Sequence, residues 1–221
     1  MSEDEAKDTL GELKRFAPPP AMDQPMSVMF FVDLSKSMKK TGITGRPGLR
    51  RIDAVIEVLK RFITQQMAAG AVMDVYSLVT FSTSTYQVRF HRQRGAEAVS
   101  KLTHETFQPC GDAEYSEIIG AMGALAVPGQ ACRVIFLSDG CTRPLRQDVL
   151  PAFQTTIMEN PQVILHCIGF GGSDLSILQQ LAQIGRGSFS CASMDIDNLV
   201  NTFTSLSKTV TQTRNTAHSQ E

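Results

Sequence analysis

Three absences restrict the function classes open to this sequence of 221 residues. No apolar run approaches the roughly 18 residues that a membrane-spanning helix needs, so no membrane partner is expected. Lys and Arg number 21 and Asp and Glu number 22, and this near balance argues against a sequence-specific nucleic-acid-binding protein. The five cysteines include no CxxC pair, which argues against a disulfide framework or a four-cysteine zinc site.

The two ends of the chain differ in composition from the middle. Residues 1–5 are acidic and lead into no apolar segment, so no signal peptide is expected and an intracellular, cytoplasmic location is predicted. Residues 1–25 include three consecutive prolines and are predicted to form a flexible N-terminal tail. Residues 26–210 are predicted to form one domain, and the polar residues 211–221 a disordered C-terminal tail.

Between these tails, short apolar runs alternate with helical patterns. The runs at 27–32, 134–137 and 163–168 are nearly continuous, which is typical of parallel strands covered on both faces. Residues 85–90 alternate in polarity close behind the run at 72–81, which predicts an antiparallel edge strand. An α/β, doubly wound, mostly parallel sheet with helices on both faces is therefore expected. Apolar residues spaced by three and four predict the helices at 52–63, 118–125, 149–157, 175–182 and 196–206.

Two of the predicted strands end in acidic residues, and ligands of such folds bind at the carboxyl ends of the strands. The first run ends in Asp33, which is followed by hydroxyls at Ser35 and Ser37, and the run at 134–137 leads to Asp139. A carboxylate with two hydroxyls is an oxygen-only set that Mg²⁺ accepts, with waters completing the octahedron. The alternatives are that Asp33 caps a helix and that Asp139 belongs to a turn.

These motifs resemble those of the von Willebrand factor type A (vWA) domain. Residues 33–37, Asp-Leu-Ser-Lys-Ser, match its DxSxS motif, residues 135–140 resemble its strand with an Asp-Gly loop, and residues 168–189 resemble its last βαβ unit. The resemblance covers residues 26–210 and implies a Rossmann-like, six-stranded sheet with a metal-ion-dependent adhesion site (MIDAS). It further implies that Ser35 and Ser37 ligate the ion directly, and Asp33 and Asp139 directly or through water.

The third loop of this site departs from the family pattern. The family usually supplies a threonine there, whereas the aligned position is Asp112. A similar Gly-Asp-x-x-Glu loop occurs in vWA domains joined to alpha-kinases, so the resemblance implies a Gly-Asp variant of the loop. A third carboxylate would strengthen the attraction for the metal and leave the ion less electrophilic toward an acidic group of a partner.

The resemblance implies a divalent-cation-dependent protein-binding module rather than an enzyme, in which an Asp or Glu of a partner completes the coordination. Mg²⁺ is the expected cofactor, with Mn²⁺ or Ca²⁺ as alternatives. The loop from Lys36 to Arg51 contains six basic residues and no acidic one. It is either a solvated loop or a positive rim for an acidic or phosphorylated segment.

Two further functions remain open. A metal-independent vWA scaffold or adaptor would use the Asp112 loop as a hydrogen-bonded network, although three carboxylates without a cation repel one another. A metal-dependent phosphotransfer enzyme of the haloacid-dehalogenase type needs DxD, but the second position after Asp33 is Ser35. Residues 169–172 are rich in glycine, but they lack the full GxGxxG spacing of a dinucleotide-binding loop.

Cysteine and histidine residues are predicted to have structural roles. Cys110 and Cys141 both fall on the site loops, and a redox pair is conceivable there, but two ordinary small residues are the favoured interpretation. His166 lies inside an apolar strand and is expected to be a hydrogen-bonded core residue.

Overall fold

The computed structural model describes residues 25–216 apart from positions 42, 45, 84, 105–106, 141–146, 171–173 and 194. The strands are β1 (Ser27–Asp33), β2 (Val75–Ser82), β3 (Thr85–Arg94), β4 (Cys132–Ser138), β5 (Val163–Phe170) and β6 (Arg186–Ala192). The helices are the short 3-10 helix η2 (Lys36–Lys39), followed by α2 (Arg51–Ala68), α3 (Gly95–Lys101), α4 (Ser116–Leu125), α5 (Val149–Glu159), α6 (Ser176–Ile184) and α7 (Ile196–Thr216).

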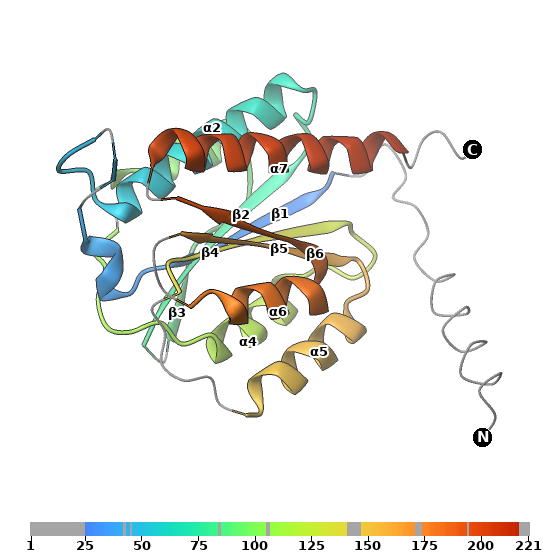
Figure 1. Cartoon of the computed structure of the whole chain (residues 1–221). Coiled ribbons are helices and arrows are strands. Elements are labelled where there is room, and N and C mark those ends of the chain that lie inside the picture. The colour runs from blue at the N-terminus through green and yellow to red at the C-terminus, as the bar shows by residue number, and fades with distance from the viewer. Residues whose placement is uncertain are drawn as a thin grey trace.

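The six strands form one sheet in the order β3-β2-β1-β4-β5-β6. All neighbours are parallel except β2 and β3, so the predicted sheet with one antiparallel edge strand is confirmed. From β1 the chain builds outward through β2 and β3, then crosses back to β4 on the other side of β1 (Figure 1). The carboxyl ends of β1 and β4 therefore form a topological switch point, where ligands of open α/β sheets bind.

Alternate side chains of β1 point into two separate hydrophobic cores. Val28, Phe30 and Val32 pack with α2, α3 and α7, and Met29 and Phe31 pack with α4, α5 and α6. Figure 1 shows α2 and α7 on one side of the sheet and α4, α5 and α6 on the other. Because both faces of β1 are covered, its whole length is buried, which explains its nearly continuous apolar sequence.

The start of β2 differs from the predicted one. The strand begins at Val75 rather than at residue 72, because Val72 and Met73 are exposed in a turn. Directly before the strand, Asp74 Oδ1 accepts a hydrogen bond from the backbone N–H of Met26 at 3.1 Å. This contact aligns the starts of β1 and β2, so a polar residue rather than the end of the apolar run decides where the strand pair begins.

The C-terminal helix α7 is longer than predicted. It includes residues 211–216, which the sequence suggested to be part of a disordered tail. Residues 1–24 and 217–221 lie outside the described part of the chain. No helix within the described ranges combines the length and the apolar character that crossing a membrane requires.

His166 of β5 is the hydrogen-bonded core residue that the sequence predicts. Its Nδ1 accepts a hydrogen bond from the backbone N–H of Ser188 at 3.3 Å and lies 2.9 Å from the Ser188 hydroxyl oxygen. Burial, together with the positive charge of Arg133, lowers the pKa of His166 to about 4. The imidazole is therefore neutral in the folded protein near neutral pH.

We expect His166→Gln to remove a pH-dependent loss of stability. In the wild type the unfolded chain takes up a proton at His166 near pH 6.5 and the folded chain only near pH 4, so stability falls as the pH drops through this window. Asp33 acts in the opposite direction, because its pKa is raised from 3.8 to about 6 on folding. The difference between the unfolding free energies of the two proteins, measured in urea at several pH values, isolates His166. A difference that does not vary with pH would contradict its burial as a neutral group.

Candidate metal centre

Two fully buried carboxylates lie at the switch point. Asp33 is the last residue of β1, and Asp139 directly follows β4. Asp33 Oδ1 accepts a hydrogen bond from the backbone N–H of Ser35 at 2.8 Å, and Oδ2 accepts one from the Ser138 hydroxyl at 2.6 Å. The Ser138 oxygen in turn accepts the Tyr115 hydroxyl proton at 2.9 Å. Tyr115 and Ser138 thus orient Asp33, a role that the sequence analysis missed.

The electrostatic environment of Asp33 favours its protonated form. Burial is the largest cause and raises the pKa of Asp33 to about 6, while the hydrogen bonds from Ser138 and Ser35 lower it. The negative charge of Asp139 raises it further. A cation at this edge of the sheet would therefore stabilise the ionised form of Asp33.

The two hydroxyls of the DxSxS motif lie next to each other. The Ser35 and Ser37 hydroxyls are hydrogen-bonded to each other, with their Oγ atoms 2.8 Å apart. Ser35 is buried and Ser37 is half-buried at the start of η2. Oxygen ligands about 2.1 Å from an octahedral Mg²⁺ ion are about 3 Å from their neighbours. The spacing of the two hydroxyl oxygens therefore fits two adjacent ligand positions of such an ion.

Asp139 is already paired with a cation of the chain. Arg51, the first residue of α2, donates a hydrogen bond from Nη1 to Asp139 Oδ2 at 2.6 Å. The side chain of Asp139 is fully buried and that of Arg51 is only 14% exposed. Because a buried carboxylate needs a partner, this ion pair compensates for the burial of Asp139. Arg51 was expected in the positive rim, and no sequence pattern pairs it with Asp139.

The predicted positive rim is therefore smaller than the count of basic residues suggested. Arg46 contacts Glu57 at 3.3 Å, and Arg50 makes two hydrogen bonds of 2.7 Å to Asp53. Three lysines of the same loop, Lys36, Lys39 and Lys40, are exposed.

The third loop is joined to the first by its backbone. The Cys110 N–H donates to the Leu34 carbonyl at 2.8 Å, and the Lys36 N–H donates to the Gly111 carbonyl at 2.9 Å. Gly111 has a positive φ of 65°, and a Cβ there would lie 2.2 Å from the Thr83 hydroxyl oxygen, so only glycine fits. The two backbone hydrogen bonds bring the Asp112 loop beside the DxSxS loop, as the resemblance implied.

The side chain of Asp112 itself is exposed, while its backbone N–H donates to the Thr83 hydroxyl oxygen at 2.6 Å. In the part of the chain that the structure describes, no three Asp, Glu, His or Cys side chains are grouped so that they could hold a metal ion. The structure therefore does not assemble Asp33, Asp112 and Asp139 into the cluster of three carboxylates that the sequence suggested. Of the conceivable redox pair, Cys110 is exposed and Cys141 lies outside the described residues, as do residues 171–172 of the glycine-rich loop.

The donor set as a whole consists of oxygen atoms, which suits a hard divalent cation. Ser35, Ser37 and Asp33 fit this role directly by type and placement, and Asp139 fits it by type, although its Oδ2 is bound to Arg51.

Comparisons with known proteins were made on sequence and on structure. A family model described as von Willebrand factor type A domain matches residues 28–142. No match was found among curated protein sequences. Similar solved structures include the PilB minor pilin from Streptococcus sanguinis (15% identity, TM-score 0.67), a von Willebrand factor type A protein from Catenulispora acidiphila (17%, 0.65) and the SpRpn10 VWA domain (18%, 0.60).

The structural matches differ in how much of each chain they cover. They cover 87%, 83% and 80% of this chain, respectively, but 63%, 42% and 95% of the other chains. This chain thus spans less than two thirds of the pilin and of the Catenulispora protein, and at these identities the likeness shows the fold alone. The family model covers more than half of the sequence, and this chain therefore belongs to the von Willebrand factor type A domain family.

Proposed function

We propose that this domain is a divalent-cation-dependent protein-binding module. Domains of this family are usually non-catalytic binding modules. Ser35, Ser37, Asp33 and Asp139 would hold the ion, with Mg²⁺ as the expected metal and Mn²⁺ or Ca²⁺ as alternatives. The observation that carries the proposal is the 2.8 Å spacing of the Ser35 and Ser37 hydroxyl oxygens beside buried Asp33 at the switch point.

The metal would supply positive charge and an open coordination position for an Asp or Glu of the partner. The chain's own residues prepare this position. Tyr115 and Ser138 fix the orientation of Asp33, and the hydrogen bond from the Ser35 N–H holds the first loop against it. Asp112, on the loop beside it, would add negative charge at the rim of the site.

The exposed lysines of the first loop support a negatively charged partner. Lys36, Lys39 and Lys40 lie on or next to η2, the same turn that carries Ser37. Their charges would attract an acidic or phosphorylated segment toward the site and accelerate its association.

A second candidate function is a metal-independent scaffold. It is favoured by the ion pair between Arg51 and Asp139, because the guanidinium already offsets the charge of one buried carboxylate. In that case Asp33 remains protonated over much of the range below pH 6, and the loops act as a fixed hydrogen-bonded surface.

Saturating Mg²⁺ or Mn²⁺ is expected to raise the melting temperature of the wild type. A ligand that binds only the native state at a hundredfold excess over its dissociation constant stabilises by about 2.7 kcal/mol, or roughly 5–10 °C for a domain of this size. The rise should vanish in Asp33→Ala and shrink in Ser37→Ala, because both variants remove an oxygen donor. Ser205→Ala, an exposed serine on α7, is the matched control and should behave as the wild type. An equal rise in Asp33→Ala would refute the site, and no rise in the wild type would favour the scaffold.

Asp112→Thr tests the third loop. This change restores the residue type usual in the family, and we expect it to keep the metal and to strengthen the binding of an acidic peptide, because less negative charge surrounds the ion. The measurement is the fluorescence anisotropy of a labelled oligo-aspartate peptide in the presence of Mg²⁺. Asp197→Thr, which removes one negative charge from the exposed start of α7, controls for net charge. Weaker metal binding in Asp112→Thr would instead identify Asp112 as a required ligand.

Arg51→Ala should destabilise the fold strongly. Removing one partner of a buried ion pair leaves the other charge uncompensated, which costs about 3–5 kcal/mol. Arg46→Ala is the control, because its ion pair with Glu57 is largely exposed and worth at most about 1 kcal/mol. Urea unfolding in the absence of divalent cations gives both values. Equal, small losses in the two variants would contradict the structural role given to Arg51.

A further inference from the structure

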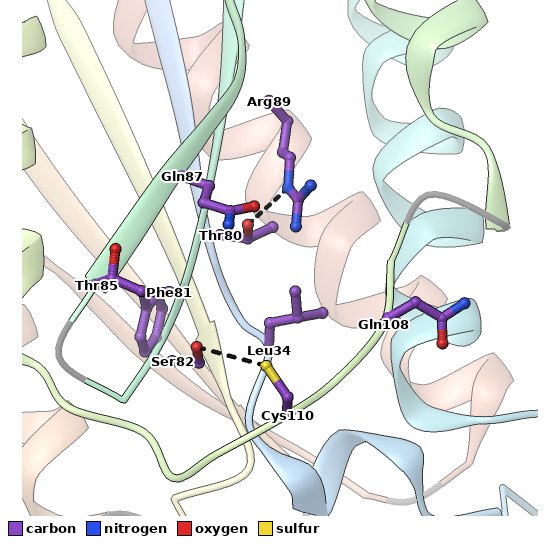
Figure 2. Close-up of a pocket in the computed structure, with 9 residues that line it drawn as sticks. All are labelled: Leu34, Thr80, Phe81, Ser82, Thr85, Gln87, Arg89, Gln108 and Cys110. Carbon is purple, nitrogen blue, oxygen red and sulfur yellow. Dashed lines mark hydrogen bonds between the residues drawn. The ribbon is translucent and has the colours of Figure 1, made fainter.

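A cavity of about 260 Å³ lies beside the candidate metal centre, on the β2–β3 hairpin. Figure 2 shows it between the end of β2, the start of β3 and the segment that carries Gln108 and Cys110. The guanidinium of Arg89 points into this space, with Gln87 on the same side of the hairpin. Leu34 forms part of the wall.

Two contacts with described residues hold Arg89 in place, and neither of them uses its outer nitrogens. Its Nε donates a hydrogen bond to the Thr80 hydroxyl at 2.9 Å, and its guanidinium carbon lies 5.6 Å from the centre of the Phe107 ring. Burial lowers the pKa of Arg89 below the usual arginine value, since the half-buried charge has lost part of its hydration.

No carboxylate of the described residues forms an ion pair with Arg89. Arg46, Arg50 and Arg51, in contrast, each contact an aspartate or glutamate at 3.3 Å or less. A partly desolvated guanidinium with a fixed orientation and no carboxylate partner is suited to bind an oxyanion through two parallel hydrogen bonds.

The other polar groups of the pocket also suit an oxyanion. Ser82 brings a hydroxyl, and Gln87 and Gln108 bring amide groups, which can donate hydrogen bonds. The Thr85 hydroxyl already donates to the Tyr86 carbonyl at 3.3 Å. None of the described residues that line the pocket is acidic. Among its described lining residues, the pocket therefore combines one positive charge with several neutral donors and no negative charge.

The pocket and the metal centre are contiguous along the first loop. Leu34 stands between Asp33 and Ser35 in the sequence, and its side chain lines the pocket. Its carbonyl accepts the hydrogen bond from Cys110, another pocket residue. Groups bound at the two sites would thus lie on either side of this loop.

We propose that the Arg89 pocket is a second anion site, which binds a carboxylate or phosphoryl group of a partner's peptide segment without a metal ion. Anion binding at Arg89 is independent of the proposed metal site. Only the further step, in which one acidic segment occupies both sites, rests on the proposed function.

The test uses the full chain in EDTA, so that a failure of the metal site does not affect it. Two probes, N-acetyl-glutamate amide and N-acetyl-phosphoserine amide, are titrated while NMR follows the Arg89 Nε–H and the backbone amides of Gln87 and Cys110. We expect saturable shifts with a dissociation constant on the order of millimolar, as for one charge-assisted contact pair. Arg89→Gln should weaken binding at least about tenfold. Arg61→Gln, which removes an exposed arginine from α2, should bind as the wild type.

The two probes distinguish the sources of the anion. Binding of the phosphoserine probe alone identifies a phosphorylated segment, and binding of the glutamate probe identifies an acidic one. Arg89→Lys, which keeps the charge but not the planar fork, should bind with intermediate affinity and serves as the test if Arg89→Gln does not fold. The proposal is wrong if neither probe causes saturable shifts, or if Arg61→Gln weakens binding as much as the Arg89 variants do.

Discussion

The burial of two neighbouring carboxylates at the switch point is the constraint on which the surrounding structure depends. An ionised carboxylate without water or a partner costs several kcal/mol, so Asp33 and Asp139 each need compensation. The structure provides it in two ways. Asp33 receives hydrogen bonds from Ser35 and Ser138 and has a raised pKa, and Asp139 receives the guanidinium of Arg51. The entry into α2 and the start of the first loop are both positioned by these contacts.

Asp33 and Asp139 are compensated differently for their burial, and this difference bears on both candidate functions. Asp33 is surrounded by hydrogen-bond donors but has no cationic partner among the described residues, whereas Asp139 has one. A divalent ion would supply the cationic partner that Asp33 lacks, and it would have to bind next to the Arg51 guanidinium. A metal-independent scaffold would use Arg51 alone. The two functions therefore differ in whether a bound metal ion or protonation balances the charge of Asp33.

Several positive charges lie at the edge of the sheet that carries the candidate metal centre. The formal net charge is −1, yet three exposed lysines lie within or directly after the DxSxS motif, and Arg89 faces an adjoining pocket with no acidic residue among its described lining residues. These charges would attract an acidic segment of the proposed partner to this edge of the sheet. Metal centre, lysines and Arg89 pocket would then act on the same kind of partner.

Local sequence patterns predict β1 to β5, the helices α2 and α4 to α7, and the adjacent hydroxyls. The last strand, β6, was implied only by the family resemblance, and α3 was not predicted. Continuous apolar runs predict buried parallel strands, and a spacing of two residues suffices to bring Ser35 and Ser37 together. The charge partners, in contrast, depend on contacts between segments that are distant in the sequence. Arg51 and Asp139 are 88 residues apart, so no local pattern could pair them, and a count of basic residues assigned Arg51 to the rim. The exposure of Asp112 and the placing of Arg89 beside Leu34 likewise follow from how distant loops pack.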